Sequence, residues 1–496
     1  MPGHFLLKCT LSIMTFGTFA NAHDFSIHEP HFSDNSTHVN VSLHLAHNIS
    51  EMSGLQVLLE SSLPEAFHDS SARHPPPRCH PGTREHYIEH ITSWAWNKGG
   101  QRTRVLLMTG AAGVGKSAIA QSCTEAVGEK LGAAFFFSRS NGHNDPKYLF
   151  TSIAYQLATR NLTYATILDD QLRRDPTIVT KSIGQQFHQL IVAPLKEMTY
   201  QGHGMDDLLV VVDGLDECSN SQRQREIAEI ITTSAYDQTT PLLWAFFSRP
   251  GPQIVAAFNS PHAVSSSTRI ELPVSRDSDP EIFNYLRGEL KKISEEHTLP
   301  VSWPSEGELQ TLVDLAAGLF IYAVTVVRFV GAYDSISPPD NIRAIIALNN
   351  SNAPTDDSLE SPLSELDIFY SHIMESIPTK VLPSIQRILL ATTAFVGGKK
   401  APQNASLLGL SEAQFRGAYR WLYAVLMPLD SDLCIRFYHS SFMEFLQDRA
   451  RSGRFCLKAQ PAIELRKSLI GKLRNIQCNF AAGAFRFLQR YKRAKY

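Results

Sequence analysis

Short apolar runs recur between residues 100 and 275, and segments with helical spacing separate them. The runs show little alternation of polar and apolar positions, which is typical of strands buried on both faces of a parallel sheet. They lie at Arg104–Thr109, Ala133–Ser138, Leu208–Val212, Leu242–Phe247 and Ile270–Val274. The pattern therefore predicts an α/β domain whose parallel sheet carries helices on both faces.

Helical spacing also appears just before the first apolar run. Between residues 84 and 96, Ile88, Ile91 and Trp94 fall on one face of a helix. This spacing predicts a lead-in helix.

After residue 280 the pattern becomes mainly helical. Helices are expected at Glu281–Glu296, Glu306–Val330, Leu363–Ser376 and Val381–Phe395, and the polar stretch Ser335–Ser364 is expected to be a loop or linker. A small mixed unit follows, with a strand-like run at Cys434–Tyr438 and a helix-like run at Ser441–Asp448.

Length and composition indicate a folded protein of several domains. A chain of 496 residues exceeds what one hydrophobic core usually serves. Hydrophobic residues make up 43% and charged residues 19%, which excludes a mainly disordered chain. The net charge of −2 favours neither nucleic acid nor an anionic membrane, so neither partner is expected. The seven cysteines form no CxxC pair or metal-ligand spacing, and they predict free thiols in a reducing compartment.

The first predicted strand ends in a glycine-rich loop of the form G-x-x-x-x-G-K-[ST]. Such a loop between a strand and a helix turns its backbone N–H groups toward phosphates, and the helix N-terminus adds its dipole. Lys116 is expected to reach the β- and γ-phosphates, and Ser117 to complete a Mg²⁺ shell. The alternative is a glycine turn with a solvated lysine. The expected nucleotide-binding residues are Gly110, Ala111, Ala112, Gly113, Val114, Gly115, Lys116, Ser117 and Ala118.

Three carboxylates follow the buried run Leu208–Val212. Asp213 ends this run, where parallel sheets bind ligands, and is expected to hold Mg²⁺ through water. Asp216 and Glu217 follow within a turn, and one of them is predicted to orient or deprotonate an attacking water. The sequence leaves open which one is the base, and a solvated turn is the alternative.

Arg249 ends the next apolar run, in Phe246-Phe247-Ser248-Arg249-Pro250. A guanidinium at this edge would sense or stabilise a γ-phosphate, so Arg249 joins Asp216 and Glu217 as a candidate catalytic residue. The alternative is an ordinary surface salt bridge.

Together these motifs resemble the NACHT domain of STAND-class signalling NTPases, and most closely the fungal NOD-like receptors with a nephrocystin-type N-terminal NACHT module. The Asp213-Gly214-Leu215-Asp216-Glu217 extension distinguishes this class from simpler P-loop enzymes. Further support comes from Pro81-Gly82-Thr83-Arg84, Phe135-Phe136-Phe137-Ser138-Arg139, Ile153-Ala154-Tyr155-Gln156-Leu157 and Gly318-Leu319-Phe320-Ile321-Tyr322-Ala323. The resemblance covers about Cys79 to Phe455.

The resemblance implies a domain order. Residues 81–275 would form the NACHT NTPase domain with its lead-in helix, 276–362 a helical domain and 363–455 a winged-helix-like domain. A short C-terminal tail, 456–496, would follow, since neither an effector domain nor C-terminal repeats are recognisable.

The resemblance also implies a function. It predicts an ADP-bound resting state, an ATP-bound state that assembles into a homo-oligomer, and slow, Mg²⁺-dependent ATP hydrolysis. His439 lies where a winged-helix histidine would contact the bound diphosphate, although a core or capping role is the alternative. A conventional P-loop ATPase or GTPase, or a nucleotide-binding interaction module without hydrolysis, are the other functions considered. ATP is chosen over GTP on the resemblance alone.

Residues 1–80 are rich in His, Ser and Asn and are expected to be a poorly ordered leader and linker. Their start also has the form of a secretory signal: Lys8 precedes the apolar run 9–20, and Ala20-Asn21-Ala22 matches a signal-peptidase site. A cytoplasmic location is nevertheless expected, because the nucleotide chemistry needs cytosolic ATP. No transmembrane segment is expected, because the longest other apolar run, Leu315–Val327, is too short to span a bilayer.

Overall fold

The computed structural model describes residues 53–98, 100, 102–205, 207–332, 337–351, 363–394, 408–427, 429 and 435–458. These residues all belong to one compact unit that begins at Ser53. Cys9, Cys434, Cys478 and the signal-like segment lie outside the described residues, and the four described cysteines are free thiols.

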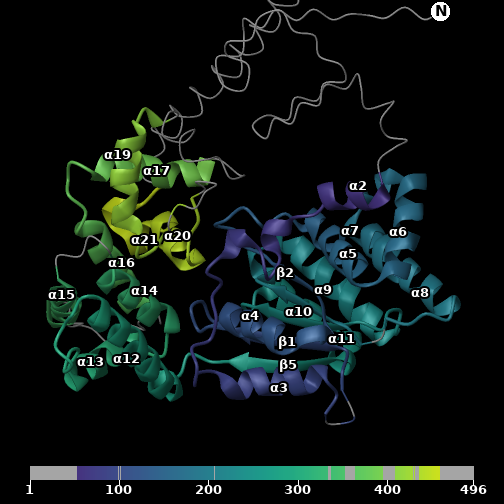
Figure 1. Cartoon of the computed structure of the whole chain (residues 1–496), viewed down its shortest axis with the longest axis horizontal. Coiled ribbons are helices and arrows are strands. Elements are labelled where there is room, and N and C mark those ends of the chain that lie inside the picture. The colour runs from purple at the N-terminus through teal and green to yellow at the C-terminus, as the bar shows by residue number, and fades with distance from the viewer. Residues whose placement is uncertain are drawn as a thin grey trace, which may run out of the picture. The chain divides into compact units, whose positions relative to one another are not determined.

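Five parallel strands form the central sheet, in the order β2-β3-β4-β1-β5 (Figure 1). Their bounds are β1 Val105–Gly110, β2 Leu131–Phe136, β3 Leu209–Asp213, β4 Leu243–Ser248 and β5 Ser267–Leu272. Each strand overlaps one of the five predicted runs, and the predicted α/β fold is confirmed. Because β4 lies between β1 and β3, the ends of these three strands are adjacent: Thr109 pairs with Ser248, and Asp213 with Phe247.

Helices cover both faces of the sheet (Figure 1). Leu106 and Met108 of β1 face the core that includes α3 (Glu85–Ala95) and α4 (Lys116–Ala126). Val105 and Leu107 face the opposite core. That second core includes side chains of α5 (Leu149–Arg160), α6 (Leu162–Arg174), α8 (Ala193–Tyr200), α9 (Ser221–Tyr236) and α10 (Pro252–Phe258). The strands therefore carry apolar side chains on both faces, which explains their lack of alternation.

The segment 53–80 packs against the sheet domain. Helix α2 (Gly54–Glu60) buries Leu58 in the core shared with α5 and α6. Ser53 caps α2 and donates its hydroxyl hydrogen to the Asp169 carboxylate over 2.7 Å. Arg73 donates to the side chain of Gln121 on α4 over 2.8 Å. This part of the predicted leader is thus in contact with the helix that follows the glycine loop.

The described residues after the sheet are mainly helical, as predicted. The helices are α12 Asp279–Glu296, α13 Glu306–Ala316, α14 Phe320–Val330, α15 Pro338–Ser351, α16 Ser364–Glu375, α17 Leu382–Ala394, α19 Glu412–Tyr419, α20 Ser440–Gln447 and α21 Arg449–Ser452. A single antiparallel bridge between Leu426 and Phe437 precedes α20, and Cys434 of the predicted strand lies outside the described residues.

Two helical predictions need correction. The single helix predicted for residues 306–330 is broken, because Ala317 and Gly318 adopt left-handed backbone angles (φ of 47° and 78°). A Cβ on Gly318 would lie 2.6 Å from the Ser275 carbonyl oxygen, so the break allows a close approach that a side chain would prevent. Part of the predicted loop 335–364 is helix α15, whose Ile342 and Ile345 are buried in the core of the helical region.

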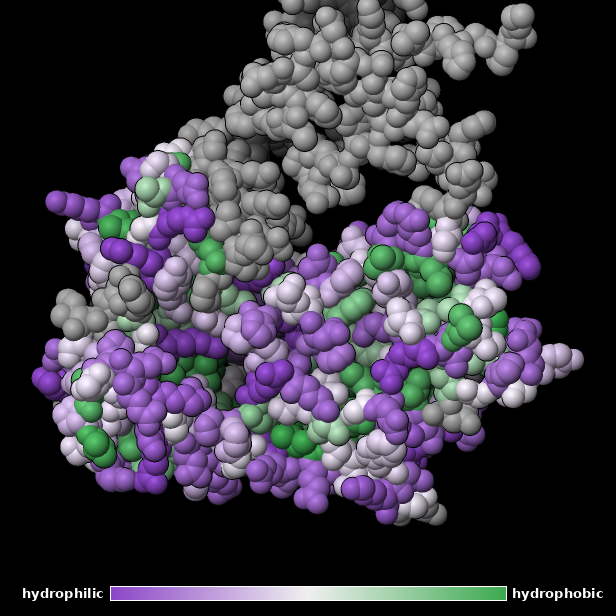
Figure 2. Space-filling view, viewed as in Figure 1, coloured by the Kyte–Doolittle hydropathy of each residue, from purple (hydrophilic) through white to green (hydrophobic). Residues whose placement is uncertain are grey.

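Hydrophilic residues cover most of the face seen in Figure 2, and the apolar residues there form small separate groups. Among the described residues, none of the helices has both the length and the apolar character that a bilayer crossing requires.

Candidate nucleotide-binding site

The glycine loop joins β1 to α4 and is covered by the first turn of α14. Gly113 and Gly115 adopt positive φ angles of 78° and 104°, which favour glycine. A Cβ on Gly113 would lie 2.2 Å from Cγ2 of Ile321, and the Ile321 N–H donates to the Gly113 carbonyl over 3.1 Å. The remaining loop residues lie as predicted between strand and helix, with Val114 buried and Ala118 in the first turn of α4.

Lys116 begins α4 and folds its side chain across the loop. Its ammonium group donates to the carbonyls of Gly110 and Ala111 over 2.9 and 2.7 Å. Burial lowers the pKa of Lys116, whereas the carboxylates of Asp216 and Asp213 raise it. The cation is therefore held at the edge of the sheet where the carboxylates gather.

Asp213 ends β3, and its carboxylate is buried. This burial raises the pKa of Asp213 to about 6, whereas the nearby Ser117 side chain acts to lower the pKa. A neighbouring hydroxyl and carboxylate are oxygen ligands of the kind Mg²⁺ takes, and a cation beside Asp213 would offset the cost of burying its charge. Among the described residues, no group of three or more His, Cys, Asp or Glu side chains forms a metal site. Ser117 and Asp213 have the oxygen atoms to hold Mg²⁺ together with nucleotide phosphates.

The burial of Asp213 predicts a stability cost that depends on pH. Because its folded-state pKa of about 6 exceeds the ordinary value near 3.8, ionisation destabilises the fold. The cost grows as pH rises from the ordinary value to about 6 and stays at its full size at higher pH. Asp213→Asn is expected to raise the free energy of unfolding by up to about 3 kcal/mol at pH 8 in a chelator, and by less at pH 5. Thermal and urea unfolding at both pH values measure this difference. A variant less stable than the parent at pH 8 would contradict the assignment.

Asp216 and Glu217 lie in the turn after β3 but have different partners. One carboxylate oxygen of Asp216 accepts from the Ser248 hydroxyl over 3.1 Å and from the Arg249 N–H over 2.9 Å. Glu217 accepts from the Arg139 N–H over 2.8 Å. Burial and the neighbouring Asp216 charge raise the pKa of Glu217 to about 7. Asp216 is thus tied to the end of β4, whereas Glu217 has the basicity of a proton acceptor at neutral pH.

Arg249 connects this cluster to α20. Its guanidinium pairs with Asp216 over 3.3 Å and donates to both carboxylate oxygens of Glu444 over 2.7 and 3.0 Å. It also donates to the Ser440 hydroxyl over 3.0 Å. Arg249 therefore forms salt bridges, as the alternative interpretation allowed, but they join two distant parts of the chain rather than surface neighbours.

His439 caps the N-terminus of α20. Its Nδ1 accepts from the Ser441 N–H over 3.1 Å and shares a 2.7 Å hydrogen bond with the Ser441 hydroxyl. Burial, followed by the positive charge of Arg249, lowers the pKa of His439 to about 4. The imidazole is therefore neutral at pH 7, and Nε2 carries the proton because Nδ1 accepts from a backbone N–H. These contacts are those of the capping alternative, and Nε2 remains a donor.

Glu444 and Ser440 also belong to this region, and neither was predicted from the sequence. Glu444 and Ser440 lie 195 and 191 residues after the arginine that they contact. The spacing of residues along the chain does not indicate a contact between positions so far apart. An alignment of related sequences in which Arg249 and Glu444 change together would indicate it.

Residues 82–249 match the family model described as "Nephrocystin 3, N-terminal". This match supports a NACHT-like NTPase module over these residues. The match spans the lead-in helix, the glycine loop, Asp213 and Arg249, so the module contains all of the predicted site except His439.

Solved structures with a similar arrangement are distant from this chain. Cdc6p from Pyrobaculum aerophilum is 11% identical with a TM-score of 0.36, over 79% of this chain and 98% of that chain. The RuvB Holliday junction branch migration motor of Thermotoga maritima is 9% identical with a TM-score of 0.27, over 73% of this chain and 94% of that chain. No curated protein matches the sequence.

Proposed function

We propose that this chain is a nucleotide-dependent molecular switch, which hydrolyses ATP slowly and responds to whether ATP or ADP is bound. The observation that carries the proposal is the position of Arg249 between Asp216 of the NTPase module and Glu444 of α20. A change from ATP to ADP would alter the contacts of the Arg249 side chain, and would thereby strengthen or weaken the ion pair between the module and α20. A homo-oligomer in the ATP state and a signalling role of the NOD-like receptor class are parts of the same proposal.

The chemistry assigns a separate role to each residue. Lys116 would bind the β- and γ-phosphates, and Ser117 and Asp213 would hold Mg²⁺, which neutralises phosphate charge when bound. Glu217 would accept the proton of the attacking water, since a pKa of about 7 suits a proton acceptor at neutral pH. Asp216 would position the end of β4 and with it Arg249.

The alternatives receive less support. A nucleotide-binding module without hydrolysis would not need a basic carboxylate beside the loop. A P-loop enzyme that transfers phosphate to another molecule would need a site for that molecule, whereas the turn of α14 at Ile321 and helix α20 stand next to the loop and to Arg249.

We expect the purified chain to carry bound ADP. The salt bridge between Arg249 and Glu444 occupies the guanidinium best placed to meet a γ-phosphate, so this conformation favours the diphosphate. Denaturing the protein and separating the released nucleotide by chromatography measures its identity and amount. A nucleotide-free protein that turns over ATP rapidly would contradict the switch.

Glu444→Ala is expected to accelerate the exchange of bound ADP by about tenfold, because loss of a part-buried ion pair removes one constraint on opening. Exchange is measured by release of a fluorescent ADP analogue after addition of excess ATP. Glu375→Ala is the matched control, since it removes a more exposed ion pair, with Arg454, from the neighbouring helix α16. Equal exchange rates in the parent and both variants would contradict the role of Glu444.

A further inference from the structure

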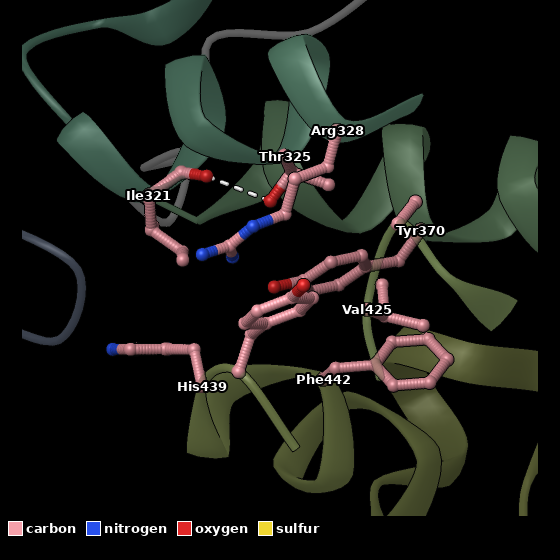
Figure 3. Close-up of a pocket in the computed structure, with 9 residues that line it drawn as sticks. Ile321, Thr325, Arg328, Tyr370, Val425, His439 and Phe442 are labelled. Atoms are coloured by element: carbon pink, nitrogen blue, oxygen red, sulfur yellow. Dashed lines mark hydrogen bonds between the residues drawn. The ribbon is translucent and has the colours of Figure 1, made fainter. Parts of the chain in front are cut away.

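A pocket lies where α14, α16 and the start of α20 meet (Figure 3). Its lining includes Ile321, Thr325, Arg328, Tyr370, Tyr438 and His439. Two hydroxyl groups in it have partners: Thr325 donates to the Ile321 carbonyl over 2.7 Å, and the Tyr370 hydroxyl bonds that of Ser441 over 2.8 Å. The pocket is thus a built polar site within an otherwise apolar junction.

Arg328 has no carboxylate partner and no hydrogen bond among the described residues. Its guanidinium instead lies over the Tyr438 ring, 3.3 Å from the ring centroid, and burial lowers its pKa. Three other part-buried arginines in this unit pair with a carboxylate: Arg84 with Glu281, Arg249 with Glu444 and Arg451 with Asp367. Within the described part of the chain, Arg73 also lies over an aromatic ring without an ion pair, but it donates to Gln121 and to two backbone carbonyls. A part-buried guanidinium with unused donors is costly unless an acceptor satisfies it. The tyrosine ring fixes the guanidinium and leaves its N–H groups available at the edge.

The Arg328 guanidinium extends toward Ile321, in the turn of α14 that contacts the glycine loop (Figure 3). Helical side chains lean toward the N-terminus of their helix, and the N-terminal turn of α14 contacts the loop through Ile321 and Gly113. In Figure 3 the side chains of Arg328 and His439 extend in the same direction, beside Ile321. The positive charges of Lys116 and Arg328 also lower the pKa of His439, with smaller effects than burial and Arg249. The imidazole therefore lies within the electric field of both cations.

The charges in this conformation suit a diphosphate. Glu444 and Asp216 already neutralise Arg249. Two cations without a carboxylate contact, Lys116 and Arg328, both lie close enough to His439 to lower its pKa, and Nε2 of His439 adds a neutral donor. A ligand that meets these three groups needs several acceptor oxygens and negative charge, as the phosphates of a nucleotide have.

We propose that Arg328 is a phosphate-binding residue of the nucleotide site, and that it favours the nucleoside diphosphate over the triphosphate. The inference rests on the proposed switch function. Arg328 contributes from the helical region, so its bond to a phosphate would hold that region against the loop when ADP is bound. The affinity for ATP would depend less on Arg328. The γ-phosphate of ATP would attract Arg249 away from Glu444, which would loosen the helical region that carries Arg328.

The experiment compares the affinities of ADP and a non-hydrolysable ATP analogue for the nucleotide-depleted full chain with Mg²⁺, by competition against a fluorescent ADP. Arg328→Gln should weaken ADP binding about 10- to 100-fold, as expected for loss of one charge-assisted contact, and ATP-analogue binding by less. Arg343→Gln is the matched control, because Arg343 is an exposed arginine on α15 paired with Asp340.

Arg328→Lys keeps the charge with a smaller group and guards against a folding defect. It should fold like the parent, as judged by thermal unfolding, and show an intermediate loss of ADP affinity. Equal ADP affinities in the parent, R328Q and R328K would overturn the inference.

Two further arms separate the sources of failure. If the parent chain binds neither nucleotide, the proposed function fails; if the parent binds ADP, Lys116→Ala does not and R328Q binds as tightly as the parent, only the inference fails. Inorganic phosphate without nucleotide tests whether Arg328 binds a free phosphate ion instead. Protection of the parent but not of R328Q from thermal unfolding by phosphate, with equal ADP affinities, would assign the pocket to a free anion and overturn the nucleotide assignment.

Discussion

Lys116→Ala is expected to reduce nucleotide affinity at least about 100-fold. The Lys116 ammonium now donates to two loop carbonyls, and its hydrogens can pass to phosphate oxygens by a small movement of the side chain. Each charge-assisted contact contributes about 1.5–3 kcal/mol, so the loss of two corresponds to two or more powers of ten in affinity. Calorimetric titration with ADP and Mg²⁺ measures this loss.

The matched control for this prediction is Lys196→Ala, because Lys196 is an exposed lysine on α8. Lys116→Ala also leaves the loop carbonyls free to bond water, so the fold should persist and circular dichroism should be unchanged. If Lys116→Ala retains the ADP content and affinity of the parent, the assignment of the glycine loop as the phosphate site is wrong.

The elements predicted correctly from the sequence are those whose signal is local. A buried strand is a continuous apolar run, and the glycine loop is a contiguous motif, so both could be located without knowledge of their neighbours. The break at Ala317 and Gly318 was missed because the apolar periodicity continues through it. The reason for the break is the backbone of Ser275, which is distant in sequence.

The contacts of the site residues could be predicted only in part. The sequence places Asp216 and Glu217 side by side and leaves their roles open. Their partners differ because the pairing of Asp213 with Phe247 sets the turn after β3 beside Ser248 and Arg249, which only one of the carboxylates reaches. Such distinctions depend on sheet register, which spacing along one chain does not contain.

The contact between Arg249 and Glu444 is the interaction through which the bound nucleotide would affect the position of α20 in the proposed switch. Asp216 and Glu444 hold the same guanidinium from the NTPase module and from α20. A γ-phosphate that attracted Arg249 would compete with Glu444, and the coupling free energy would equal the difference in Arg249 contacts between the two nucleotide states. Arg328 would act in the opposite sense, since it favours the state in which α14 and α20 remain near the loop.

Glu217→Gln is expected to reduce ATP hydrolysis about 100- to 10,000-fold while ATP binding persists, because general-base catalysis contributes a factor of that size. Gln keeps the shape of the side chain and can still accept from the Arg139 N–H, but it cannot accept a proton from water. Single-turnover release of phosphate, measured together with retained ATP, separates hydrolysis from binding. Glu229→Gln on α9 is the matched control, since Glu229 pairs with Arg225 on the helix surface.

The pH dependence of ATP hydrolysis tests whether Glu217 is the base. Because burial and Asp216 raise the pKa of Glu217 to about 7, the unprotonated base becomes available as pH rises through 7, and single-turnover hydrolysis should increase between about pH 6 and pH 8. The residual rate of Glu217→Gln should lack this step. Asp216→Asn should keep a rising profile with its midpoint shifted to lower pH, because removing a neighbouring negative charge favours ionisation of Glu217. A step that persists in Glu217→Gln and disappears in Asp216→Asn would assign the base to Asp216 instead.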